Sequence, residues 1–79
     1  MITRDDVQRF ADTHVSFFDN NVTTALEAEA CFIFESGLDR ELDNNTRLWL
    51  QTYLPHDVNT RRDLCEQRRQ VFARVRPDV

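Results

Sequence analysis

The fold is decided by residues 3–18, TRDDVQRFADTHVSFF, the clearest amphipathic segment of the chain. Thr3 is placed to accept a hydrogen bond from the Asp6 amide, and the acidic residues 5–6 suit the positive end of a helix dipole. The i, i+3, i+4, i+7 spacing puts one set of side chains on a single helical stripe: Val7, Phe10, Ala11, His14, Phe17 and Phe18. This segment predicts a helix that needs a partner for its apolar stripe.

Helical periodicity continues through the middle of the chain. A capping box that begins at Thr24 predicts the start of a second helix, which Gly37 ends. Ser36 is in position to cap a third helix, which runs to Pro55 with the asparagines 44–45 as a point of interruption. Only one glycine and two prolines occur in 79 residues, so few positions break the helices.

A fourth helix is expected to begin at Asp57 or Thr60 and to end at Pro77. Its predicted inner face consists of Val58, Leu64, Cys65, Val71, Phe72 and Val75. Short links between amphipathic helices favour antiparallel neighbours. The sequence therefore predicts an all-α fold, a compact bundle of three to four amphipathic helices in one domain that spans residues 1–79.

The composition indicates a folded chain with more aromatic surface than a small monomer easily covers. A chain of this length buries only about 60% of the surface that it exposes when unfolded, yet it contains six Phe, one Trp and one Tyr. We therefore expect a protein partner, a second copy in a homodimer, or both. The candidate contact residues are Phe34, Trp49 and Tyr53.

No apolar run approaches the length of about 18 residues that a membrane span requires, and residues 1–8 are too charged for a signal peptide. No membrane association is expected, and the predicted location is cytoplasmic. The two cysteines, Cys31 and Cys65, can form at most one disulfide within the chain, and neither lies in a CxxC motif. Reduced, buried thiols are the favoured interpretation.

Charge is unevenly distributed along the chain. All ten basic residues are arginine, and seven of them lie between Arg47 and Arg76, whereas ten of the fourteen acids lie between Asp5 and Asp43. This asymmetry favours a charged partner, but it is equally consistent with two halves that neutralise each other within one fold. The sequence does not explain why lysine is absent.

Two charged residues are predicted on apolar helix faces. Helical projection puts Glu29 within the inner arc of the second helix, and Arg68 within that of the fourth. We predict a structural ion pair between Glu29 and Arg68, with Arg61 as a second choice of partner, because a lone buried charge is costly. The alternatives are that both side chains extend to water at the edge of the core, or that Arg68 faces a second subunit or another protein.

The remaining arginines of the fourth helix form a candidate nucleic-acid surface: Arg62, Arg69, Arg74 and Arg76. Asp63 and Glu66 are interspersed with them, and the chain is acidic overall, with a net charge of −4. The same arginines are therefore equally suited to neutralising acids of the first half of the chain. Conversely, the acidic outer faces of the first three helices are compatible with mimicry of nucleic acid towards a basic partner.

Residue types that carry catalysis are sparse. Gly37 is the only glycine, which excludes phosphate-binding glycine loops and nucleophile elbows. His14 lies on an apolar stripe, where a packed histidine with one hydrogen bond is the simpler interpretation, and His56 lacks a second metal ligand at useful spacing. No catalytic residue, metal or cofactor is predicted; an enzyme that uses Cys65 and His14 is the third choice.

These observations favour a small acidic helical protein-interaction module, such as an inhibitor, adaptor or accessory subunit, without catalysis of its own. The alternative is a nucleic-acid-binding regulator that uses the arginine-rich C-terminal helix.

Overall fold

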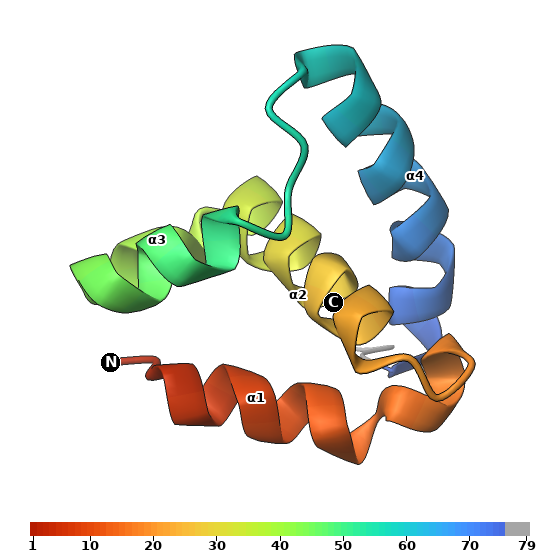
Figure 1. The fold of residues 1–79 in the computed structure, drawn as a ribbon, viewed down its shortest axis with the longest axis horizontal. Coiled ribbons are helices and arrows are strands. Elements are labelled where there is room, and N and C mark those ends of the chain that lie inside the picture. The colour runs from red at the N-terminus through yellow and green to blue at the C-terminus, as the bar shows by residue number, and fades with distance from the viewer. Residues whose placement is uncertain (76–79) are drawn as a thin grey trace.

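The computed structural model describes residues 1–75, which fold into the helices shown in Figure 1. The elements in chain order are α1 (Arg4–Thr13), η1 (Val15–Phe18), α2 (Val22–Ser36), η2 (Leu38–Glu41), α3 (Asn44–Gln51) and α4 (Val58–Val75), where η marks a 3-10 helix. The predicted all-α bundle is confirmed. Within residues 1–75, the one β-type pairing is an isolated bridge between Ile2 and Leu42.

The first helix begins as predicted and ends earlier than predicted. The Asp6 amide donates to Thr3 Oγ1 at 3.2 Å, and the Thr3 amide donates to the Asp6 carboxylate at 3.0 Å, which completes a capping box. The α-helix stops at Thr13 and continues as the tighter turn η1. A 3-10 helix has three residues per turn, so side chains after Thr13 point in other directions than they would in a continued α-helix. Phe18 is buried, whereas Phe17 is 48% exposed and does not belong to the inner face.

The second helix begins before the predicted capping box. The Asn21 side chain accepts from the Thr24 amide at 3.2 Å and so caps α2, which places Thr24 inside the first turn. Gly37 ends the helix as predicted, with a φ of 81° that suits glycine. Ser36 does not cap a third helix, because its hydroxyl donates back to the Phe32 carbonyl at 2.6 Å within α2.

The predicted third helix is two shorter elements. After η2, Leu42 is extended, and Asp43 starts α3 by accepting from the Thr46 amide at 2.7 Å. The break is fixed by the N-terminus, where the Ile2 amide donates to the Glu41 carbonyl at 2.9 Å. Helix α3 ends at Gln51, four residues before Pro55, so the connection to α4 is longer than expected.

The fourth helix carries its apolar face mainly in its second half. Asp57 caps it by accepting from both the amide and the hydroxyl of Thr60, at 2.8 and 2.9 Å. Cys65 and Phe72 are buried, whereas Val58, predicted on the inner face, is 55% exposed. Figure 1 shows the first turns of α4 extending away from α1. Pro77, the predicted end, lies outside the described residues.

The core is centred on α2. Its buried side chains meet Val7 and Ala11 of α1, Phe18 of η1 and Leu50 of α3. On the side of α4, Phe72 packs against Phe32 and Phe10, with ring centroids 5.0 and 5.9 Å apart. Every other described element therefore depends on α2 for burial.

A disulfide between Cys31 and Cys65 joins α2 to α4. The prediction of reduced thiols is therefore wrong for this structure, although both cysteines are buried, as expected. The sequence separation of 34 residues concealed the pairing, which depends on α2 and α4 packing so that the two Cα atoms lie 5.4 Å apart.

Candidate functional site

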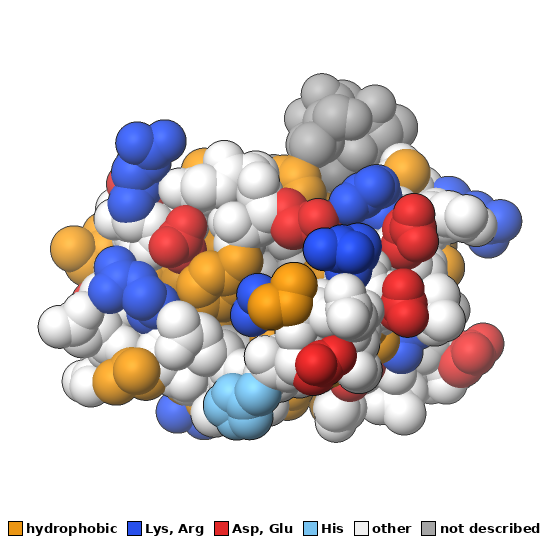
Figure 2. Space-filling view, turned by 90° about the horizontal axis from the view of Figure 1, so that it is seen from above, with side chains coloured by type: hydrophobic (Ala, Val, Ile, Leu, Met, Phe, Trp, Pro, Cys, Tyr) orange, Lys and Arg blue, Asp and Glu red, His pale blue; other side chains and the backbone are white. Residues whose placement is uncertain are grey.

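A cleft of about 630 Å³ lies between the end of α2, the connection that follows α3 and the first turns of α4. Its apolar lining includes Phe34, Leu54, Pro55 and Val58, and the Cys31–Cys65 disulfide belongs to the same lining. Figure 2, seen from the end where α4 begins, shows hydrophobic side chains exposed among arginine and acidic ones. We refer to this cleft as the α2–α4 cleft. Its volume lies within the range of about 300–1,000 Å³ typical of ligand pockets.

Two arginines make the α2–α4 cleft locally positive. Arg61 and Arg62 line it from the second turn of α4, and both are exposed. Neither guanidinium forms an ion pair or hydrogen bond with residues 1–75. Glu35, the acid of the cleft lining, is already engaged by Arg69 at 2.9 Å. The cleft therefore offers two uncompensated positive charges on a chain whose net charge is −4.

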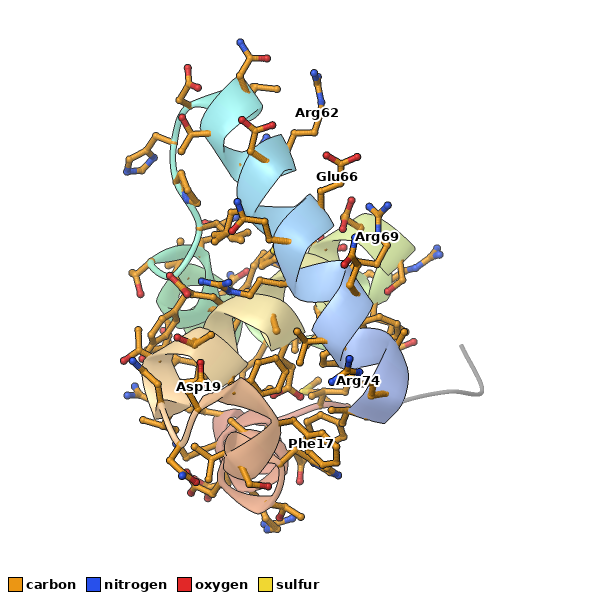
Figure 3. All side chains as sticks on the ribbon, turned by 90° about the vertical axis from the view of Figure 1, so that its right-hand side faces the viewer. Phe17, Asp19, Arg62, Glu66, Arg69 and Arg74 are labelled. Carbon is orange, nitrogen blue, oxygen red and sulfur yellow. A yellow bond between two sulfur atoms is a disulfide. The ribbon has the colours of Figure 1, made fainter. Side chains whose placement is uncertain are left out.

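The four arginines predicted as a nucleic-acid surface do not form one continuous stripe. Arg69 is paired with Glu35, and Arg76 lies outside the described residues. Figure 3 shows Glu66 between Arg62 and Arg69 on the same side of α4. Arg62 and Arg74 are twelve positions apart, which is about 18 Å along a helix and about 120° around it. Within the described part of α4, few positive charges remain to follow a phosphate backbone.

Arg68 turns towards α2, and the acid shown beside it is Glu27. The guanidinium nitrogen lies 3.2 Å from the Glu27 carboxylate, and each side chain is about one-quarter exposed, at 25% and 24%. Glu29 is buried, at 5% exposure, as its place on the inner arc predicted. The Glu29–Arg68 pair itself stays a prediction. Helical projection selected the correct pair of helices, because the ion pair between Arg68 and Glu27 joins α4 to α2.

The three aromatic residues predicted as partner contacts divide between two places. Phe34 is half-buried and lines the α2–α4 cleft. Trp49 and Tyr53 are half-buried on and just after α3, where their rings meet edge to face at 5.6 Å. Arg4 covers the Trp49 ring, 4.4 Å from its centroid. Of the three, Phe34 lines the cleft, whereas Trp49 packs against Tyr53 and Arg4 elsewhere.

The two histidines lie apart from each other and from any grouped ligands. His14 Nδ1 lies 3.0 Å from the Phe10 carbonyl oxygen, and its ring packs 4.3 Å from Phe10, as expected of a packed histidine. His56 is exposed at the cleft. No group of three histidine, cysteine, aspartate or glutamate side chains suited to a metal ion occurs within residues 1–75. Both sulfur atoms are held in the disulfide, so neither supplies a thiolate nucleophile in this state.

Three aspartates at helix starts have a pKa below the ordinary value. The pKa of Asp57 lies below its ordinary value because the carboxylate accepts from the backbone amide and side chain of Thr60. The Thr46 amide lowers the pKa of Asp43, and the Thr3 amide lowers that of Asp6, by the same mechanism. These groups stabilise helix starts, and they show no sign of the raised pKa that a carboxylate acting as a general acid requires.

No family model, curated protein or solved structure matches the chain. None of the helices within residues 1–75 has the length and apolar character needed to cross a membrane. Sequence reasoning missed the α2–α4 cleft because its walls come from three separate elements. The available signal was the turn at residues 55–56, followed by Arg61 and Arg62 on the second turn of the next helix.

Proposed function

We propose that the protein is a protein-interaction module without catalysis, and that its binding site is the α2–α4 cleft. The occupant is a partner segment that carries a large apolar side chain next to a carboxylate. The apolar group sits against Phe34, Leu54 and Val58, and the carboxylate pairs with Arg61 and Arg62. The observation that supports the proposal most directly is the combination of an apolar cleft with two unpaired guanidinium groups.

Charge favours an acidic occupant over a basic or neutral one. Although the whole chain is acidic, the distant acids are screened over a Debye length of about 8 Å at physiological salt. The charges that line the cleft therefore dominate, and these are the two arginines and Glu35, whose carboxylate is already paired with Arg69. Arginine also binds carboxylates in a planar, bidentate manner, which favours a carboxylate at a defined position.

Selection from short random peptides displayed on phage tests this proposal. Peptides enriched on the folded protein are expected to share a large apolar residue beside Asp or Glu. The R61Q/R62Q variant is expected to bind them about ten-fold more weakly or worse, because charge-assisted pairs are lost. The matched control is R74Q, which removes an exposed arginine of the same helix that does not line the cleft. Equal loss in both variants, or no enriched peptide at all, would contradict the proposal.

The nucleic-acid alternative and the homodimer stay predictions, and each has a direct test. Salt-dependent binding to random-sequence duplex DNA at about 50 mM salt would favour the regulator over the interaction module. Sedimentation equilibrium of the purified protein would show whether a second copy associates. If it does, and R61Q/R62Q dissociates the dimer, the occupant of the cleft is the same chain.

The cytoplasmic location also stays a prediction, and it bears on the state of the site. Disulfides persist in oxidising compartments, whereas the reducing cytosol keeps most thiols free. The compartment therefore determines whether the Cys31–Cys65 bond in the cleft lining is closed or open.

A further inference from the structure

The disulfide lies between two hollows. Cys31 and Cys65 line the α2–α4 cleft, and they also line a second hollow of about 400 Å³ that includes Phe32 and Phe72. Only 3% of Cys31 and 4% of Cys65 is exposed. The bond therefore contributes to the lining of the proposed binding site, and a change in its state directly affects that surface.

The contacts that hold α4 are concentrated on one side of Cys65. Residues 58–63 are all exposed, and Leu64 is half-buried. Beyond the cysteine, Arg68 pairs with Glu27, Arg69 pairs with Glu35, and Phe72 is buried. The disulfide is thus the last strong attachment of α4 to α2 before the exposed first turns.

The two arginines of the cleft lie one helical turn before that attachment. Arg61 and Arg62 precede Cys65 by four and three positions, so they share its side of the helix. The bond therefore fixes the turn that presents both guanidinium groups. Among residues 58–64, Leu64 alone is half-buried, and the other side chains are exposed.

We propose that the Cys31–Cys65 disulfide is a redox latch that controls the α2–α4 cleft, an inference that rests on the proposed function of that cleft. The oxidised bond holds the first two turns of α4 against α2 and keeps the site formed. Reduction releases these turns while the second half of α4 stays packed. The arginine-bearing wall then moves away from Phe34, and the partner segment dissociates.

The reductant is a dithiol or a pair of small-molecule thiols. Because both cysteines are almost fully buried, the reductant reaches the bond when the first turns of α4 open locally. Its thiolate then attacks one sulfur of the disulfide and forms a mixed disulfide, and the other cysteine leaves as a thiolate that takes up a proton. A second thiolate of the reductant then displaces the remaining cysteine, so two electrons and two protons pass to Cys31 and Cys65. The reductant becomes a disulfide. Because Phe72 and the two ion pairs keep Cys65 close to Cys31, the effective concentration of the thiols is high and reoxidation is favoured.

Hydrogen exchange read by mass spectrometry tests the latch without any partner. The full chain is compared oxidised, reduced with a dithiol, and as the C31A/C65A variant. Beyond the acceleration that the loss of global stability causes in the whole chain, amides of residues 58–64 are expected to exchange about ten-fold faster or more in the reduced protein, whereas residues 66–75 should show no such additional change. Unchanged exchange in both halves, or equal acceleration of both halves, would overturn the latch. The variant controls for the reductant, which should not alter its exchange.

Peptide binding separates the latch from the proposed function. Peptides selected on the oxidised protein are expected to bind the reduced protein about ten-fold more weakly, because a smaller fraction of the protein molecules has a formed cleft. Reoxidation should restore the affinity. If the exchange result holds but affinity does not change, the latch does not control the cleft and the inference is wrong. If no peptide is selected, the proposed function fails, while exchange still decides whether the latch opens locally.

Discussion

The two halves of α4 differ in what holds them to the rest of the molecule. The second half is attached by a buried phenylalanine and two ion pairs with α2, whereas the first half is exposed from residue 58 to residue 63 and ends at the disulfide. One continuous helix therefore combines a structural segment with a segment whose side chains remain available. The difference teaches that helical periodicity alone does not show which turns are packed.

The largest expected effect comes from the packed half. Phe72→Ala is expected to lower the free energy of unfolding by about 3–5 kcal/mol, because it removes a buried ring that packs against Phe10 and Phe32. Val58→Ala is the matched control in the exposed half, with an expected change within about 0.5 kcal/mol. Urea denaturation followed by circular dichroism measures both. Similar losses of stability in the two variants would show that the two halves of α4 do not differ in how they are held.

Removing the Cys31–Cys65 disulfide, which lies at the boundary between the two halves of α4, is expected to have the next largest effect. The C31A/C65A variant is expected to lose about 2–4 kcal/mol of stability, because the disulfide closes a loop between residues 34 positions apart. The reduced wild-type protein should show a similar loss without any substitution. If the reduced protein is as stable as the oxidised one, the contacts of the packed half of α4 are sufficient to hold the helix on α2 without the disulfide.

Double-mutant cycles compare ion pairs on the packed side of α4. Coupling between Arg69 and Glu35, whose side chains are 64% and 48% exposed, is expected to be about 0.2–1 kcal/mol. Coupling between Arg68 and Glu27 should exceed it, because both side chains are less exposed and less screened. The same cycle between Arg68 and Glu29 tests the predicted pair, and coupling near zero would exclude it.

The cap of α4 should act on the exposed half alone. Asp57→Ala is expected to accelerate hydrogen exchange severalfold in the first turn of α4, because Thr60 loses its acceptor, with little change near Phe72. Asp43→Ala at the start of α3 is the matched cap control, and it should leave α4 unchanged. Equal acceleration along the whole of α4 would show that the two halves open together.

Acid should weaken the same cap. The folded-state pKa of Asp57 is lowered, so its contribution to stability is present above the unfolded pKa and is lost as pH falls through the folded value. Exchange in the first turn of α4, corrected for the intrinsic pH dependence, should therefore lose protection below about pH 4. In the Asp57→Ala variant this loss should be smaller. The same acid dependence in both proteins would assign it to other carboxylates, such as Asp6 and Asp43.

Local features were predictable because they depend on residues close together in sequence. The capping box of Thr3 and Asp6, the end of α2 at Gly37 and the cap at Asp57 all follow from contacts within three or four positions. The asparagines 44–45 marked an interruption close to the boundary between η2 and α3, but the contact of the Ile2 amide with the Glu41 carbonyl, which lies at this boundary, joins residues far apart in sequence and was not predicted. Phe17 was misassigned because a change from α to 3-10 geometry is not visible in the spacing of apolar residues.

The amino-acid sequence by itself determined the all-α class, the starts of α1 and α4 and the acidic and arginine-rich halves, because these properties depend on composition and on short-range hydrogen bonds. Tertiary structure alone decided the pairing of Cys31 with Cys65, the ion pair between Arg68 and Glu27 and the α2–α4 cleft. These features join residues more than 20 positions apart. Their distances are set by how α2 and α4 pack, and the periodicity of either helix alone does not contain that information.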